Sequence, residues 1–368
     1  MNQSKTVKIL AEIAILAVLV GVLVFLGTSY FRSNVPASSI TYPGSWIRTP
    51  GPGGKEIRSL LWLDNEKMLL AGGRVGKDFD GIGVYSPQNI EWERPATGLE
   101  LEQTVVDIKT VGDQIWSVFF ANQSNPGGLL ISEDHGLSWS QPITISGNID
   151  PRCIEIISES KSTVLLGSVK EGIYRSEDYG KTWQRSDTGL KNFHIQCLCQ
   201  DPFDISNILA GTIEGLYQSS DSGHTWKEIK NGLPTNTALT VDIEADPVNK
   251  GMFTALVRDK KGMSYVLQSS NSGGSWHQRM TGLPADVQVR SICYHPTVSN
   301  RIFIGTVHDG VYRSDNGGEQ WSPMNTNLPI TVNYIIVHAL AFRTSPPERL
   351  YAGTDLDGSV WEYQFENY

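Results

Sequence analysis

The sequence predicts an all-β protein, a seven-bladed β-propeller preceded by one N-terminal transmembrane helix. Three observations predict this fold class. An eight-residue motif ending in tryptophan recurs five times at intervals near 45 residues. Short apolar or alternating segments lie between the copies, separated by Gly, Pro, Asn and Asp, and a period near 45 fits one four-stranded blade. A single long apolar stretch stands near the N-terminus.

The N-terminal stretch Ile9 to Leu26 is apolar except for Glu12 and follows Lys5 and Lys8. Because a bilayer core needs about 20 apolar residues in a helix, this segment is long enough to span it. The preceding lysines favour a cytoplasmic N-terminus and an extracytoplasmic remainder. A cleaved signal peptide is the alternative, and it would lead to secretion.

The chain therefore divides into three predicted parts. The anchor or signal peptide covers residues 1–27, and a Ser/Thr/Pro-rich linker covers residues 28–44. The propeller covers residues 45–368. We expect it to lie on the extracytoplasmic side of a cell membrane, held by a single-pass anchor.

The five octets share Ser first, Asp or Asn third, Gly fifth and Trp eighth. The third side chain can accept a backbone N–H two residues on, the glycine supplies a positive φ, and the tryptophan packs between blades. These residues are predicted to be structural: Asp134, Gly136, Trp139, Asp178, Gly180, Trp183, Asp221, Gly223, Trp226, Asn271, Gly273, Trp276, Asn316, Gly318 and Trp321.

The third strand of each repeat gives the number of blades. It occurs seven times, at 83–85, 129–131, 172–174, 215–217, 265–267, 310–312 and 359–361. The last repeat has no fourth strand, whereas Ser45 to Arg48 reads as a fourth strand without its first three. We therefore expect the N-terminal strand to complete the C-terminal blade and close the ring.

The octets resemble the Asp-box, also called the bacterial neuraminidase repeat. That resemblance implies a propeller whose boxes lie on outer hairpins, away from ligands. The pairs Asp201-Pro202 and Asp246-Pro247 resemble the xyloglucanase and sortilin-type versions. In its seven blades and expected export, the chain also resembles the photosystem II assembly factor family, whose members are not enzymes. The Arg-Ile-Pro segment of sialidases is missing, and one propeller would supply half of a xyloglucanase cleft.

Charge and cysteine content exclude several functions. A net charge of −9 opposes binding to nucleic acid, which needs a basic surface. Four cysteines in 368 residues do not form a disulfide framework of the small secreted kind. Cys153, Cys197 and Cys199 fall on expected inner strands as buried thiols or, alternatively, metal ligands. Because no His/Cys cluster at zinc spacing accompanies them, we expect neither a metal nor a cofactor.

One face of the propeller carries the turns between second and third strands together with the connections between blades, and we expect ligands on that face. Its candidate residues are Glu171, Glu214, His308, Asp309, Asp355 and Asp357. These side chains would form an acidic ring that attracts a cation or a basic segment. Alternatively, an acid before glycine is simply good hairpin chemistry.

The predicted function is a membrane-tethered, non-catalytic platform for protein binding or assembly. The short, similar connecting loops leave little material for a deep catalytic pocket, so no catalytic residue is assigned. The alternative is a glycoside hydrolase or carbohydrate-binding protein of the sialidase or xyloglucanase kind. The expected partner is another protein or a glycan on the loop face, besides the membrane itself.

Overall fold

The computed structural model describes residues 43–75, 81–95, 104–120, 126–145, 149–157, 163–330, 335–356 and 358–365. All of them belong to one compact unit, Ser38–Tyr368. The predicted anchor (1–27) and most of the predicted linker lie outside the described residues. Within the described ranges, no helix is long and apolar enough to cross a membrane.

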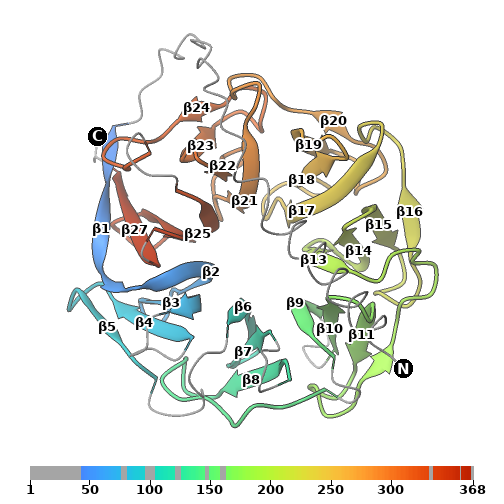
Figure 1. Cartoon of the computed structure of the whole chain (residues 1–368), viewed down its shortest axis with the longest axis horizontal. Coiled ribbons are helices and arrows are strands. Elements are labelled where there is room, and N and C mark those ends of the chain that lie inside the picture. Colours follow the sequence, from blue (N-terminus) through green and yellow to red (C-terminus); the bar gives the residue numbers. More distant parts are fainter. Residues whose placement is uncertain are drawn as a thin grey trace, which may run out of the picture. The chain divides into compact units, whose positions relative to one another are not determined.

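Seven antiparallel sheets surround a central channel (Figure 1). Blade 1 contains β2 (Gly54–Leu63), β3 (Met68–Val75), β4 (Ile82–Ser86) and β5 (Glu91–Glu93). Blade 2 contains β6 (Val105–Val111), β7 (Gln114–Phe119) and β8 (Gly128–Ser132). Blade 3 contains β9 (Pro151–Ile157), β10 (Thr163–Ser168), β11 (Ile173–Ser176) and β12 (Gln184–Arg185). Blade 4 contains β13 (Ile195–Asp201), β14 (Asp204–Thr212), β15 (Gly215–Ser219) and β16 (Lys227–Ile229).

The remaining blades complete the ring. Blade 5 contains β17 (Thr237–Ala245), β18 (Phe253–Asp259), β19 (Ser264–Ser269) and β20 (His277–Gln278). Blade 6 contains β21 (Gln288–Tyr294), β22 (Ile302–Val307), β23 (Val311–Ser314) and β24 (Ser322–Pro323). Blade 7 contains β25 (Val337–Arg343), β26 (Arg349–Thr354), β27 (Ser359–Phe365) and, as its outermost strand, β1 (Gly44–Pro52). The predicted all-β seven-bladed propeller is confirmed.

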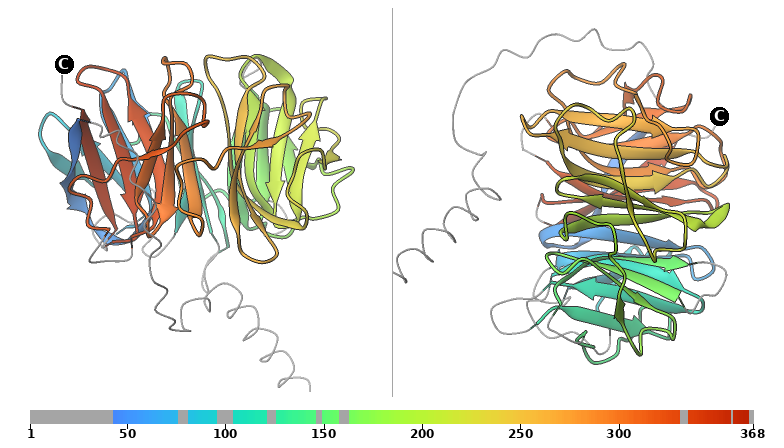
Figure 2. Two further views of the ribbon diagram at one scale, coloured as in Figure 1. Left: turned by 90° about the horizontal axis from the view of Figure 1, so that it is seen from above. Right: turned by 90° about the vertical axis from the view of Figure 1, so that its right-hand side faces the viewer.

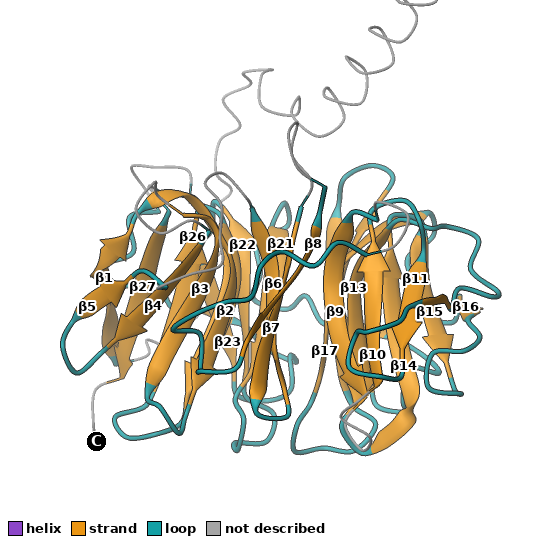
Figure 3. Cartoon of the chain, turned by 90° about the horizontal axis from the view of Figure 1, so that it is seen from below, coloured by secondary structure: helices purple, strands orange, loops and turns teal. Residues whose placement is uncertain are grey.

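The strands run between two opposite faces of the ring, so the turns gather on those faces (Figures 2 and 3). The first strand of each blade is innermost. Because successive strands are antiparallel, the first strands begin on the face that carries the turns between second and third strands. We call this the entry face, and the face that carries the octets the octet face.

The second strands are the most buried strands of the blades. All six residues of β10 are buried, as are the last six residues of β14. Both faces of these strands pack against neighbouring blades, which is why they read as continuous apolar runs rather than alternating ones. The hydrophobic core is therefore a ring of seams between blades rather than one central cluster.

Blade 2 departs from the expected four strands. After its octet, the fourth position makes only one isolated bridge, between Ile143 and Leu129. Pro142 precedes that bridge and has no N–H to donate to the ladder. The prediction of four strands in every repeat is therefore wrong for this blade.

Ring closure follows the expected route. Strand β1 pairs antiparallel with β27, with Trp46 opposite Tyr363. The Trp46 side chain is 1% exposed, and its Nε1–H donates to the Met324 carbonyl at 2.5 Å. Its backbone N–H donates to the Thr326 carbonyl at 3.0 Å. The N-terminal strand thus fills the outer edge of blade 7 and also contacts blade 6.

Each octet closes a turn through the same hydrogen bonds. In the copy after β15, the Ser219 hydroxyl accepts the Gly223 N–H at 2.8 Å, and the Asp221 carboxylate accepts the Thr225 N–H at 2.8 Å. The N–H accepted by the third residue is therefore four residues on, not two as predicted. Ser222 has φ 59° and Gly223 has φ 87°, a left-handed pair that suits glycine at the second position.

Replacing Trp46 tests the closure. Trp46→Ala removes a buried indole that packs on Tyr363 and hydrogen-bonds to Met324, so we expect a loss of about 3–5 kcal/mol in the free energy of unfolding. Urea unfolding at neutral pH measures it. Ile47→Ala is the matched control, because Ile47 is the next residue and is 47% exposed. Equal losses for the two variants would contradict the closure role.

Replacing Asp221 tests the octet turn. Although burial raises the pKa of Asp221, hydrogen bonds from Thr225 and Ser219 lower it to about 2. A depressed folded-state pKa stabilises the protein above about pH 4, and this stabilisation is lost as the pH falls toward 2. We expect Asp221→Ala to cost about 1–2 kcal/mol at pH 7 and about half of that at pH 3. Thermal unfolding at both pH values measures this difference.

Asp221→Asn is the control, because two octets carry asparagine at this position and Asn271 Oδ1 accepts the Ser275 N–H at 2.9 Å. A cost for Asp221→Ala that does not change with pH would show that the carboxylate hydrogen bonds are not the source of the stability.

Candidate functional site

Every innermost strand carries a β-bulge at an equivalent position, and the seven residues bulged at this position form a ring. We call them the bulge ring: Arg58, Val106, Arg152, Gln196, Val241, Arg290 and His338. A bulge leaves its residue out of the ladder and redirects the side chain. All seven residues line one cavity of about 260 Å³ inside the channel.

The bulges occur within one repeated tripeptide. The residue after each bulge is Ser, Asp, Cys or Ala, and the next is Ile or Leu, as in Arg58-Ser59-Leu60 and Arg290-Ser291-Ile292. The second position is thus always a small residue and the third always Ile or Leu, whereas the bulged position holds Arg, Val, Gln or His. This contrast was the available sequence signal for the cavity, and our sequence analysis missed it.

Three arginines and one histidine make one end of the cavity cationic. Arg58 Nη2 pairs with Glu56 Oε1 at 2.9 Å, and Arg152 Nη2 donates to Gln196 Oε1 at 2.9 Å. The guanidinium carbons of Arg58 and Arg152 lie 5.5 Å and 5.3 Å from the ring centre of Phe120. This aromatic ring orients two guanidinium groups that repel each other.

Electrostatics in this cluster is dominated by burial and by like charge. Burial, followed by the charges of Arg152 and Arg58, lowers the pKa of Arg290 to about 10. Burial together with Arg290 and Arg58 lowers the pKa of His338 to about 3. At neutral pH the cluster therefore holds three positive charges and a neutral imidazole. An anion in the cavity would relieve this repulsion.

His338 also has a donor without an acceptor. Its side chain is 8% exposed, and its Nδ1 accepts from Arg290 Nε at 3.3 Å. This bond assigns the proton of the neutral ring to Nε2, and Nε2 has no hydrogen-bond partner among the described residues. The nearest carboxylate oxygen, Glu56 Oε2, is 3.9 Å away. Buried Arg58 Nε likewise lacks a partner in the described part of the chain.

The residues that directly follow the bulges also line the cavity, and we call them the staple ring: Ser59, Asp107, Cys153, Cys197, Asp242, Ser291 and Ala339.

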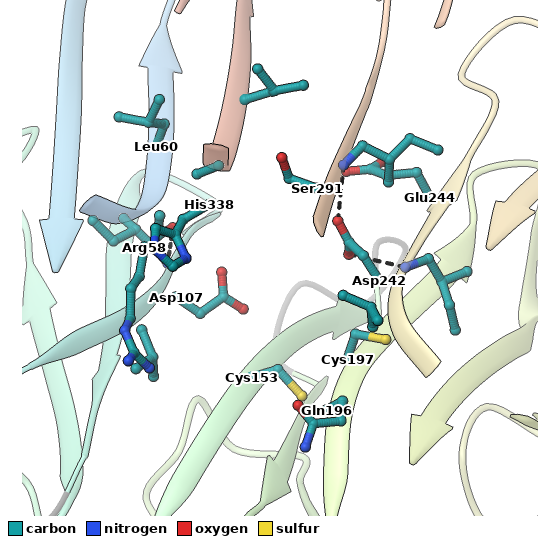
Figure 4. Close-up of a pocket in the computed structure, with 18 of the residues that line it drawn as sticks. Arg58, Leu60, Asp107, Cys153, Gln196, Cys197, Asp242, Glu244, Ser291 and His338 are labelled. Atoms are coloured by element: carbon teal, nitrogen blue, oxygen red, sulfur yellow. Dashed lines mark hydrogen bonds between the residues drawn. The ribbon is translucent and has the colours of Figure 1, made fainter. Parts of the chain in front are cut away.

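Three staple residues accept a backbone N–H from the innermost strand of the next blade. Ser59 Oγ accepts from Ile108 at 3.1 Å, and Asp107 Oδ2 accepts from Ile154 at 3.0 Å. Asp242 Oδ2 accepts from Ile292 at 3.1 Å. Figure 4 shows Asp107 and Asp242 projecting into the channel from opposite sides. These carboxylates stabilise the inner wall and also carry charge into the cavity.

Toward the octet face the cavity becomes acidic. Lys109 Nζ lies 3.9 Å from Glu155 Oε2. Burial raises the pKa of Glu155 to about 7 against the opposing effect of Lys109. Burial and the neighbouring carboxylates raise the pKa of Glu244 to about 8, and burial raises that of Asp242 to about 6. Four carboxyl groups, counting Asp107, thus share one lysine.

None of the described residues predicted for the ligand face lines this cavity. Glu171, Glu214 and Asp309 lie on turns, where each N–H donates to a Ser or Thr hydroxyl at the end of the preceding strand. His308 is exposed with φ 80°. Asp355 accepts the Ile336 N–H at 2.7 Å. The predicted Asp357 lies outside the described residues.

In the described part of the chain, no group of three or more His, Cys, Asp or Glu side chains could hold a metal ion. Cys153, Cys197 and Cys199 are buried free thiols, and Cys293 is partly buried. Burial raises the pKa of Cys153 well above its usual range, so this thiol is neutral at physiological pH.

No family model matches the chain, and no curated protein matches it. Solved structures resemble it. A GH74 xyloglucanase from Xanthomonas campestris has a TM-score of 0.63 and 16% identity, covering 87% of this chain and 53% of the enzyme. YCF48 bound to a D1 peptide has a TM-score of 0.63 and 17% identity, covering 90% of this chain and 99% of YCF48. YCF48 from Cyanidioschyzon merolae has a TM-score of 0.62 and 15% identity, covering 88% of this chain and 100% of that YCF48 chain.

These likenesses show the fold. The chain spans about half the length of the Xanthomonas xyloglucanase and nearly all of YCF48. A propeller alone is compatible with enzymes and with binding proteins, so function has to be argued from the cavity.

Glu244 gives the cavity a measurable pH dependence. Its folded-state pKa of about 8 exceeds the unfolded value near 4.3, so the folded protein binds more protons between these values. Its contribution to stability therefore falls as the pH rises from about 5 to 8. We expect Glu244→Gln to remove this loss and to be more stable than the original protein by about 1 kcal/mol at pH 8. Urea unfolding at pH 5 and pH 8 measures both effects.

Glu319→Gln is the matched control, because Glu319 is an exposed octet residue away from the channel. If Glu244→Gln and Glu319→Gln showed the same pH dependence, the Glu244 carboxyl would not be perturbed in the way described.

Proposed function

We propose that this propeller is a non-catalytic binding protein that holds an anionic group of a partner protein on its bulge ring. One observation carries the proposal. Arg58, Arg152 and Arg290 come from three different blades and line one cavity together with the unpartnered Nε2–H of His338. Among the described residues only Arg58 of the three arginines forms an ion pair, with Glu56, so an incoming anion would complete the cluster.

Guanidinium groups suit a carboxylate because their planar N–H donors match its two oxygens. The first strands begin at the entry face, so an extended segment that enters from this face would meet Arg58 and Arg290 before Glu244. YCF48 has been solved with a D1 peptide, and this precedent supports a peptide as the ligand of a propeller with this fold. An acidic side chain or a chain terminus would supply the anion.

The proposed location comes from the N-terminal segment. The apolar run Ile9 to Leu26 after Lys5 and Lys8 supports a membrane-tethered propeller on the extracytoplasmic side. The partner would then be a membrane or envelope protein that presents an acidic segment near the bilayer surface.

A glycoside hydrolase is the second candidate, because Glu155 and Glu244 have raised pKa values and a general acid needs such a shift. The channel argues against it. Glu244 lines the cavity of about 260 Å³, and Glu155 lines an adjoining pocket of about 180 Å³, whereas a polysaccharide needs an open cleft for several sugar rings. Release of sugar from a glycan panel, lost in Glu244→Gln, would favour the enzyme.

Partner capture tests the binding function. The full-length protein is crosslinked in membranes and purified, and its partners are quantified for the original chain, Arg290→Gln and Arg185→Gln. We expect Arg290→Gln to lose a partner about ten-fold or more, because a buried charge-assisted contact is worth at least about 1.4 kcal/mol. Arg185→Gln should retain it, because Arg185 is an exposed residue paired with Asp187.

Circular dichroism and melting curves establish that both variants fold. If folded Arg290→Gln captured every partner as well as the original protein, the bulge ring would not be the binding site.

A further inference from the structure

We infer that the cavity binds a ligand bearing both a carboxylate and a primary ammonium group on a short flexible chain. The carboxylate lies on the arginines of the bulge ring, and the ammonium lies deeper, beside Asp242 and Glu244. The carboxylate half rests on the proposed function. The ammonium group is the new part of the inference. It specifies the ligand as an ω-amino carboxylate rather than as any anion.

The first argument is that both charged levels belong to one cavity. Arg58, Arg152 and Arg290 line it together with Asp107, Asp242 and Glu244. Asp107 and Asp242 directly follow their bulged residues and Glu244 follows Val241 by three residues, so the wall changes from basic to acidic toward the octet face. A ligand with a single charge would satisfy one level and leave the other unsatisfied.

The second argument is that the acidic level lacks cations. Lys109 lies 3.9 Å from Glu155, and the described residues place no second lysine or arginine on this level of the cavity wall. The Glu244 side chain forms no hydrogen bond or ion pair with any described residue. Asp242 uses both oxygens for backbone N–H groups, yet it keeps its charge toward the channel. An added ammonium would be shared by Asp242 and Glu244, and its charge would favour the ionised form of the Glu244 carboxyl, whose pKa burial raises to about 8.

The third argument concerns length. Glu244 follows the bulged Val241 by three residues, and three residues of a strand rise about 10 Å. The arginine side chains shorten this span because they extend inward. A ligand with five methylene groups between its charged ends therefore fits the two levels. A cavity of about 260 Å³ has room for one such chain but not for a folded peptide.

Two sources present this chemistry, a free amino acid of that length and a C-terminal lysine of a partner protein. Both carry a carboxylate and a primary ammonium. A C-terminal lysine would join the inference to protein binding, because its backbone continues out through the entry face.

Three linear probes of six carbons each test the charge pattern: 6-aminohexanoate, adipate and 1,6-diaminohexane. Binding to the full-length protein in detergent is measured by titration calorimetry and by NMR line broadening of the probe. We expect 6-aminohexanoate to bind about ten-fold or more tightly than either of the other two, because only this probe pairs with both levels.

Variants assign the two ends. Glu244→Gln should weaken 6-aminohexanoate about ten-fold without weakening adipate, whereas Arg290→Gln should weaken both. Glu319→Gln should bind all three probes as the original protein does. Peptides ending in Ala-Ala-Lys with a free or an amidated C-terminus distinguish the sources. Binding of the free peptide alone indicates a C-terminal lysine, and binding of neither peptide indicates a free amino acid.

The outcomes separate this inference from the proposed function. If adipate bound as tightly as 6-aminohexanoate and Arg290→Gln weakened both, the ammonium level would be wrong and the anion site would stand. If no probe bound while Arg290→Gln still lost its partner, the inference about the ligand would be wrong and the proposed binding function would stand. If 1,6-diaminohexane bound best and Arg290→Gln had no effect, both would be overturned.

Discussion

The structure depends on how seven innermost strands can face a common channel without leaving their inner edges unpaired. Each of these strands has a neighbour in its own blade on one side only, so the N–H groups of the other edge need acceptors. Hydrogen bonds between blades supply them. Ile108 donates to Ser59, and Ile154 donates to Asp107. At these positions Ser59 and Asp107, and Asp242 elsewhere in the ring, take the place of a neighbouring strand and link adjacent blades.

The bulges follow from the same constraint and give the channel its chemistry. At a bulge the residue leaves the ladder, so its side chain contributes little to sheet pairing and can vary. Seven equivalent positions then hold three arginines, a histidine, a glutamine and two valines. The blades thus keep one framework while the bulge ring differs from blade to blade. Function in such a fold lies in the few positions that the framework does not constrain.

Much of the fold could be predicted because the octets report it directly. A serine, an acid or amide, a glycine and a tryptophan at fixed spacing gave the repeat period, the recurring third strands gave seven blades, and β1 closes the ring as expected. Blade 2 has no regular fourth strand, because Pro142 cannot donate to the ladder. The repeat period alone does not predict this difference. The site was missed for a geometric reason. Strand alternation assigns Arg58 or Arg290 to a face only if the register is regular, and a bulge shifts it by one residue.

The charge arrangement in the channel implies that ligand binding and stability are linked. Burial and mutual repulsion lower the pKa of Arg290, while burial raises the pKa of Glu244; both shifts record interactions that oppose the charged form. The two clusters lie at different levels and compensate each other only at a distance. A ligand that neutralises either level removes part of this cost from the folded state alone, and it therefore stabilises the propeller by mass action. A strained, well-defined cavity of this kind is what a preorganised binding site requires.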